Sequence, residues 1–179
     1  GDVALTGVCL TFPIIMFISA FASLAGMGGA PKASIAMGKG EMDKANKILG
    51  NSFLLTLVLS VILTVITSIF NRDLLYAFGA SDNTIEYASS YMKIYSIGTI
   101  FVMTAMGLNS FITAQGFSKD SMINVVIGAV SNIILDPIFI YGFKMGVEGA
   151  ALATILSQFV TFLLNVLLGN LIAPIKSAL

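Results

Sequence analysis

The segment Ser121-Met-Ile-Asn-Val-Val-Ile-Gly-Ala-Val-Ser-Asn-Ile-Ile-Leu-Asp-Pro-Ile-Phe-Ile-Tyr-Gly-Phe143 decides the fold class of this chain. It holds 23 residues and a single charged side chain, Asp136. Because a helix needs about 20 apolar residues to cross the ~30 Å hydrocarbon core of a bilayer, this segment predicts a transmembrane helix. A charge inside such a helix is costly and is kept mostly where it faces a protein interior or a water-filled cavity. Asp136, next to Pro137, is therefore the first candidate functional residue.

Four other segments of similar length carry no charged side chain: residues 3–31, 48–71, 94–118 and 149–175. Of the 179 residues, 57% are hydrophobic and only 10% are charged, whereas soluble domains carry roughly 25% charged residues. We predict an all-α membrane protein, a polytopic bundle of five transmembrane helices. Their expected bounds are about 4–37, 41–70, 84–114, 119–141 and 147–170. Since the loops are short, residues 1–179 are expected to form a single transmembrane helical bundle.

Lysine and arginine are distributed unevenly between the two ends of these helices. The segment 32–47 holds four lysines and the loops at the same end add Lys119 and Lys176, whereas the other end holds Arg72 and Lys144. The positive-inside rule then places the lysine-rich 32–47 loop in the cytoplasm and the N-terminus outside. We expect a multi-pass protein of the plasma (inner) membrane. Because no basic region or cleavable signal precedes the first helix, we also expect an upstream helix that this sequence does not include.

Several classes of function are disfavoured by composition. The net charge is zero, which argues against a nucleic acid partner. The sequence contains no His and only one Cys, so imidazole metal sites, His-based catalysis and internal disulfides are excluded. A lone buried carboxylate without a partner base, metal ligands or a nucleophile makes no active site, and we predict no enzyme activity and no cofactor.

Two polar stripes lie on the last two predicted helices. On the helix over 119–141, Asn124, Gly128, Asn132 and Asp136 recur every four residues and share one face. On the helix over 147–170 the polar positions are Thr154, Ser157, Gln158, Thr161 and Asn165. Consecutive antiparallel helices can turn such stripes toward each other across the bundle interior. The hydroxyl positions fit an interhelical hydrogen-bonding seam as well as a cavity wall, whereas the charge of Asp136 favours a function.

Two further polar patterns have structural explanations. On the second predicted helix, Ser52, Thr56, Ser60, Thr64 and Ser68 recur every four residues, which is typical of a packing seam whose hydroxyls bond carbonyls of their own helix. Tyr87, Tyr91 and Tyr95 lie near the outer end of the third, where an interfacial aromatic belt explains them at least as well as a ligand does. Residues 71–83, which join these two helices, are expected to include a short interfacial helix.

The chemistry of Asp136 suits a coupling site for ions. Burial disfavours the charged form of a carboxyl, so this side chain can bind a proton or share a cation with amide and hydroxyl oxygens. Thirteen Phe and nine Met residues also suit a pocket for greasy substrates, although the same residues make ordinary helix contacts.

Four runs of sequence resemble one known family, the multidrug and toxic compound extrusion (MATE) transporters. They are Gly38-Lys-Gly-Glu-Met-Asp-Lys-Ala-Asn-Lys-Ile-Leu-Gly-Asn-Ser-Phe53, Asn109-Ser-Phe-Ile-Thr-Ala-Gln-Gly116, Asn132-Ile-Ile-Leu-Asp-Pro137 and Gly146-Val-Glu-Gly-Ala-Ala-Leu-Ala-Thr154. The resemblance implies a twelve-helix transporter with two six-helix lobes, in which this chain is helices two to six of the N-terminal lobe. The first helix and the C-terminal lobe are then expected partners outside this sequence.

The resemblance also implies a site. The family binds its coupling cation, H⁺ or Na⁺, with an acid on helix one, an Asn and an Asp four residues apart on helix five, and a Thr on helix six. Asn132, Asp136 and Thr154 match these positions, and the helix-one acid has no counterpart here. Asn124, Gly128, Gln158 and Thr161 are candidate cavity-lining residues.

The predicted function is cation-coupled export of small organic, cationic compounds across the bilayer. One alternative is a related flippase of lipid-linked sugars, which needs basic residues lining its cavity. The other is a membrane scaffold that transports nothing, in which Asp136→Asn would have no effect.

Overall fold

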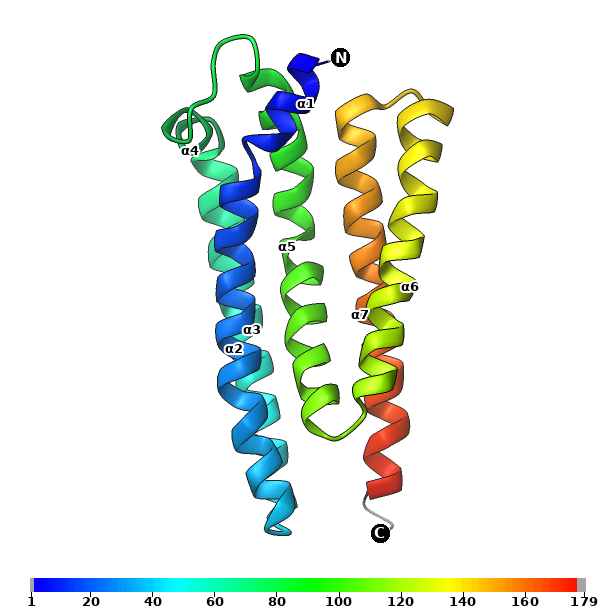
Figure 1. Cartoon of the computed structure of the whole chain (residues 1–179). Helices are drawn as coiled ribbons and strands as arrows, with labels where there is room; N and C mark the ends of the chain where they lie inside the picture. Colours follow the sequence, from blue (N-terminus) through cyan, green and yellow to red (C-terminus); the bar gives the residue numbers. More distant parts are fainter. Residues whose placement is uncertain (1, 177–179) are drawn as a thin grey trace.

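The computed structural model describes residues 2–176, with side chains over residues 2–169, and within this range the chain folds into long, roughly parallel helices (Figure 1). The elements in chain order are α1 (Asp2–Cys9), α2 (Phe12–Gly38), α3 (Met42–Ile69), α4 (Asn71–Ala77), α5 (Ile85–Ala114), α6 (Ser118–Pro137), the π-helix η1 (Ile138–Gly142) and α7 (Gly146–Lys176). Among the described residues, five helical segments are long and apolar enough to cross a membrane. The prediction of an all-α, polytopic membrane bundle is confirmed.

The helix α5 occupies the centre of the bundle (Figure 1). It contacts α1, α2, α3, α4, α6 and α7. Half of its most apolar 18-residue segment is buried inside the bundle, against 11% of the corresponding segment in the span Ser118–Gly142. Small residues allow this packing: a Cβ at Gly26 would meet Ser110, and one at Gly29 would meet Ser52 and Phe111. Glycines that let helix backbones approach closely are typical of membrane helix interfaces.

Two of the tight turns between helices are closed by a glycine in the left-handed region. Gly40 (φ 77°) follows α2 and Gly116 (φ 94°) follows α5. After each glycine, the next backbone N–H returns to a carbonyl five residues earlier: Glu41 N donates to Ala36 O at 2.9 Å, and Phe117 N to Ile112 O at 3.2 Å. This Schellman arrangement satisfies carbonyls that the helix end would otherwise leave free.

The first predicted helix is divided in the structure. It was expected to be continuous over about 4–37 with a bend at Pro13, but α1 ends at Cys9 and α2 begins at Phe12. Pro13 cannot donate a backbone hydrogen bond, and its ring would crowd the Cys9 carbonyl in a regular helix. The break precedes the proline because the residues that must give way lie in the turn before it. Pro31, in contrast, is accommodated within α2.

The prediction that hydroxyls of the α3 seam bond carbonyls of their own helix is confirmed at Thr56 and Ser60 and is wrong at Thr64. Thr56 Oγ1 donates to Ser52 O at 2.8 Å and Ser60 Oγ to Leu57 O at 2.7 Å. Thr64 Oγ1 donates across the interface to the Ser96 carbonyl of α5 at 3.0 Å. Ser68, the last member of the pattern, is exposed.

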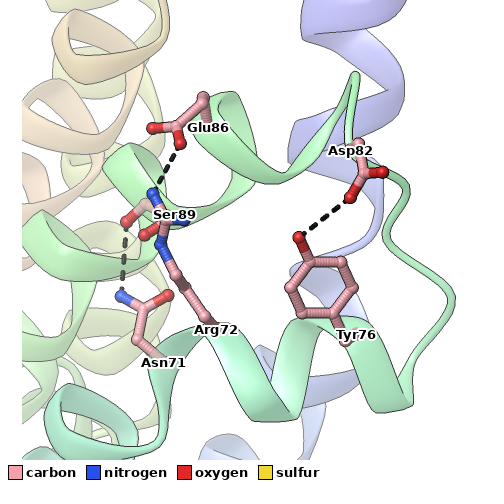
Figure 2. Close-up of polar contacts among 6 residues, drawn as sticks. All are labelled: Asn71, Arg72, Tyr76, Asp82, Glu86 and Ser89. Atoms are coloured by element: carbon pink, nitrogen blue, oxygen red, sulfur yellow. Dashed lines mark hydrogen bonds and ion pairs between the residues drawn. The ribbon is translucent and has the colours of Figure 1, made fainter.

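The short helix α4 ties the end of α3 to the first turns of α5, as Figure 2 shows. Asn71 Nδ2 donates to the Ser89 carbonyl at 3.3 Å, Arg72 pairs with Glu86 at 2.5 Å, and Tyr76 Oη donates to Asp82 Oδ1 at 3.2 Å. Beneath these contacts Leu75 is fully buried. We call residues 71–89 the outer strap, after the orientation expected from the lysine distribution.

The aromatic belt expected on α5 is wrong for two of its three tyrosines. Tyr87 is exposed, but Tyr91 and Tyr95 are buried, with ring centroids 6.1 Å apart. They belong to the core that α5 forms with Ile14 and Ile18 of α2. The outer end of a central helix is surrounded by protein, so spacing along the sequence alone misplaced these rings.

Candidate functional site

A cavity of about 430 Å³ lies between α5, α6 and α7. Its lining residues are Ala105, Met106 and Asn109 of α5, Val125, Gly128, Ala129 and Asn132 of α6, and Thr154, Ser157, Gln158 and Thr161 of α7. Among these described lining residues none is charged, and amide or hydroxyl groups make up about half of the set. The two polar stripes do face each other, with the cavity between them.

The α6 side of the site ends in a break of the helix. Asn132 lines the cavity, and Asp136 lies one turn further along the same face. Pro137 ends α6, because it has no N–H to donate to the Ile133 carbonyl, and η1 follows with longer-range bonds. Phe143 N donates to Ile138 O at 2.9 Å and Met145 N to Phe139 O at 3.0 Å. The expected helix over 119–141 is therefore α-helical only to Pro137. π-turns of this kind are frequent at functional sites.

Two buried atoms at this break have no hydrogen-bond partner among the described residues: Asn132 Nδ2 and Asp136 Oδ1. Buried polar groups in proteins are overwhelmingly paired, and an unpaired carboxylate oxygen is the most costly kind to leave so. Asp136 Oδ1 can thus receive a cation, a proton or a hydrogen-bond donor, whereas Asn132 Nδ2 can donate a hydrogen bond to an acceptor such as a ligand oxygen.

The α7 side offers hydroxyl oxygens. Thr154 Oγ1 donates to Ala150 O at 3.0 Å, Ser157 Oγ to Thr154 O at 2.7 Å, and Thr161 Oγ1 to Ser157 O at 3.1 Å. Each hydroxyl donates its proton to a carbonyl of its own helix, so the lone pairs of its oxygen remain available to other partners. Hydroxyl, amide and carboxylate oxygens are the ligands that hard cations prefer. Within the described residues no group of three or more His, Cys, Asp or Glu gathers.

Two further residues belong to this site, and the sequence reasoning missed both. The Tyr91 hydroxyl of α5 lies near the Thr154 side chain and within electrostatic range of Asp136. Asn109 lines the cavity, and its buried Oδ1 has no partner in the described part of the chain. Asn109 is an amide inside a charge-free membrane span, which was a usable signal, whereas for Tyr91 an aromatic belt was as good an explanation as a ligand.

The prediction for Asn124 is corrected. Asn124 does not line the cavity: its Nδ2 donates to Asn165 Oδ1 at 2.7 Å, and Asn165 Nδ2 donates to the Ala105 carbonyl at 3.0 Å. Both side chains are almost completely buried. The opposing amide lies close enough to satisfy Asn124, so this residue clamps α6 to α7 and α5. Gly128, Gln158 and Thr161 do line the cavity.

Comparison with known proteins identifies relatives of the whole arrangement. The family model MatE matches residues 1–138. The multidrug export protein MepA of Staphylococcus haemolyticus is 36% identical over 154 residues, covering 86% of this chain and 34% of the relative. The FAD transporter of Shewanella oneidensis is 28% identical over 169 residues, covering 92% of this chain and 37% of the relative.

Solved structures agree with the sequence matches. A crystal structure of MATE in the bent conformation superposes with a TM-score of 0.89 at 32% identity, covering 92% of this chain and 37% of that one. The inward-facing conformation of a multidrug resistance MATE family transporter also gives 0.89 at 32% identity. The chain thus spans about a third of the length of the proteins it matches. By sequence and by structure, this multi-pass membrane chain belongs to the MatE family, the MATE transporters that its motifs resemble.

Proposed function

We propose that this chain forms part of a secondary active transporter that exports small organic cations in exchange for H⁺ or Na⁺. The observation that carries the proposal is the buried Asp136 Oδ1, which has no hydrogen-bond partner among the described residues and lies one helical turn from Asn132, a residue that lines the cavity. Relatives named as multidrug export proteins support the transport activity. Since the chain spans only about a third of those relatives, the activity is proposed for the full-length protein that carries it.

In this proposal Asp136 is the coupling residue. Its carboxylate binds the proton or cation, while Asn132 and Thr154 supply neutral oxygen atoms. Tyr91 links Thr154 to the neighbourhood of Asp136, so a change of charge at Asp136 reaches both α5 and α7. A bound cation or proton neutralises Asp136, which removes the cost of holding a charge inside the membrane.

The cavity is the proposed entrance for substrate in this lobe. Gly128, Gln158 and Thr161 line it together with Met106 and Asn109. Its described lining carries no basic side chain, which favours neutral or cationic molecules over anionic ones. FAD, which gives one relative its name, and the lipid-linked sugars of the alternative flippase both carry phosphate, and for such substrates we would expect Lys or Arg in the lining.

The lysine-rich hairpin between α2 and α3 is proposed to face the cytoplasm. It lies at one end of the bundle with the α5–α6 loop, and the outer strap lies at the opposite end (Figure 1). Single cysteines placed at Lys39 and at Asp82 in a Cys9→Ala background test this orientation. A membrane-impermeant reagent should label position 82 in intact cells and position 39 only after permeabilisation; the reverse pattern would refute the orientation.

The experiment for the coupling role uses the full-length protein reconstituted in liposomes with ethidium as substrate. Asp136→Asn keeps the shape and polarity of the side chain but fixes its charge at zero. Efflux driven by an imposed Na⁺ or pH gradient should fall by about a hundredfold, matching the loss of charge-assisted interactions worth roughly 2–3 kcal/mol. Asp43→Asn, on the exposed first turn of α3, is the matched control and should leave efflux unchanged.

Each rival has its own outcome in this assay. If Asp136→Asn exports ethidium with the same dependence on the ion gradient as the unaltered protein, the residue is structural and the coupling role is wrong. If the unaltered protein exports no cation but moves a lipid-linked sugar, the flippase replaces the exporter. A protein inactive in both assays would support the scaffold.

A further inference from the structure

The close contact between η1 and the first turn of α7 lies directly beside the proposed cation site. Gly149 is the fourth residue of α7, and a Cβ there would meet the backbone of Phe139 in η1: its carbonyl carbon at 2.9 Å and its carbonyl oxygen at 3.0 Å. Real Cβ atoms essentially never approach backbone this closely. Any side chain at position 149 would therefore push η1 and α7 apart.

The Phe139 carbonyl group also accepts a hydrogen bond that stabilises the turn between η1 and α7. The Phe139 carbonyl that a methyl group would meet accepts the Met145 N–H at 3.0 Å. This bond closes the turn between η1 and α7, in which Lys144 and Gly146 both have φ 56°. A displacement of Phe139 cannot be absorbed by rotating one side chain, since it moves a hydrogen-bonded backbone segment.

A second glycine contact between the same helices behaves differently. A Cβ at Gly128 of α6 would meet the Thr161 hydroxyl of α7, which can rotate away. Asn132 and Asp136 lie along α6 between these two contacts, and Thr154 lies along α7 between Gly149 and Thr161. The contact at Gly149 is therefore the one that fixes backbone against backbone at the Asp136 end of the site.

We propose that Gly149 is a positioning residue that sets the separation between the Asp136 carboxyl group and the Thr154 hydroxyl group. Asp136 precedes Phe139 by three residues, and Thr154 follows Gly149 by five on one helix, or about 7.5 Å at 1.5 Å per residue. The two halves of the site are thus fixed relative to each other through the Gly149–Phe139 contact. This inference rests on the proposed role of Asp136 in cation coupling.

The test compares Gly149→Ala with Gly169→Ala in the full-length protein, reconstituted with ethidium as substrate. Gly169 lies on the same helix, and a Cβ there would have no atom within 4 Å. For Gly149→Ala, the Na⁺ concentration, or the proton concentration, that gives half-maximal efflux should rise about tenfold, because small misplacements of site groups carry penalties of this order or more. The ethidium KM should stay unchanged, and Gly169→Ala should match the unaltered protein in both measurements.

A second variant changes the Gly149–Phe139 contact from the η1 side. Pro137→Ala restores an N–H that can bond the Ile133 carbonyl, which favours a regular α-helix over η1 and moves Phe139 relative to Gly149. The same rise in half-maximal cation concentration is expected. If Gly149→Ala fails to reach the membrane, Pro137→Ala decides the question.

Asp136→Asn in the same assay separates this inference from the function on which it rests. If Asp136→Asn loses cation dependence while Gly149→Ala and Pro137→Ala keep the unaltered half-maximal concentration, the positioning role is wrong and the coupling role stands. If Asp136→Asn keeps its cation dependence, the proposed function fails first. A lower maximal rate with unshifted cation dependence for Gly149→Ala would mark a general packing defect and overturn the positioning role.

Discussion

The two halves of the polar stripe on α6 differ in whether their polar groups are hydrogen-bonded, although both halves have the same spacing and face α7. We name the halves inner and outer after the orientation expected from the lysine distribution. At the inner half, Asn124 is paired with Asn165, which in turn bonds the Ala105 carbonyl, so three helices are joined. At the outer half, Asn132 Nδ2 and Asp136 Oδ1 are buried and without partners in the described residues. One half of the stripe is a clamp, and the other is the candidate site.

The difference shows that periodicity predicts a shared face but not the use made of it. What separates the halves is the residue that α7 presents across the interface. Opposite Asn124 it presents an amide, which has both a donor and an acceptor. At the outer half it presents hydroxyls whose protons are already bonded within α7. A polar group becomes available to an ion or ligand where the facing helix leaves it unsatisfied.

The largest effect on stability is expected when the clamp formed by Asn124 and Asn165 is removed. Asn165→Leu leaves the Asn124 amide N–H buried without its acceptor and removes the additional bond to the Ala105 carbonyl, which should lower the free energy of unfolding by about 2 kcal/mol. Thermal unfolding of the purified protein in detergent measures this. Leu167→Val, at an exposed position of the same helix, is the control and should change stability by less than about 0.5 kcal/mol. A clamp variant as stable as this control would mean that the two halves do not differ as described.

The same amide type in the other half should give the opposite result. Asn132→Ala removes an amide donor that has no partner among the described residues, so stability should change by less than about 0.5 kcal/mol. Efflux driven by the ion gradient should fall about tenfold, as expected when one hydrogen bond of roughly 1–1.5 kcal/mol to the bound ion's ligand set is lost. The two variants, Asn165→Leu and Asn132→Ala, are assayed side by side for melting and transport. Loss of stability in Asn132→Ala without a transport defect would make the outer half a second clamp.

Tyr91 raises the question of whether a residue of the buried core also takes part in the candidate site. Its ring is buried in the core, and its hydroxyl lies near the Thr154 side chain and within electrostatic range of Asp136. Tyr91→Phe keeps the ring and removes the hydroxyl, so gradient-driven efflux should fall about threefold, the equivalent of roughly 0.7 kcal/mol. Tyr87→Phe, on the exposed side of the same helix, provides the matched control. If both variants transport alike, the Tyr91 hydroxyl is no part of the site.

The features of this molecule that could be predicted from the sequence are those determined by solvation and by hydrogen bonds within one helix. Charge-free length alone located the membrane helices, because a bilayer core excludes charged residues over a fixed thickness. The seam at Thr56 and Ser60 followed from local bonding, since each hydroxyl uses a carbonyl of its own helix. Asp136 stood out because its charge is alone in its span.

The parts that sequence missed depend on which residue lies across an interface. The assignment of Asn124 to the cavity failed because Asn165, 41 residues away, satisfies it. Tyr91 was misread because the central position of α5 is a property of the assembled bundle. The π-turn after Pro137 was not predicted, because η1 packs against Gly149 of α7 and no local pattern reveals that contact.

The smallest effect is expected in the outer strap, whose polar contacts are exposed. Arg72 and Glu86 pair at 2.5 Å, but their side chains remain 52% and 70% exposed. Exposed ion pairs contribute about 0–1 kcal/mol because water and salt screen them. Arg72→Gln should therefore lower the free energy of unfolding by less than about 0.5 kcal/mol at low salt, and by less still at about 1 M salt, where the Debye length is roughly 3 Å. Thermal unfolding at the two salt concentrations measures the difference, with Lys144→Gln at the same end of the bundle as control. A large, salt-independent loss for Arg72→Gln would mean that the strap acts like the buried clamp, and that water exposure does not separate these polar contacts.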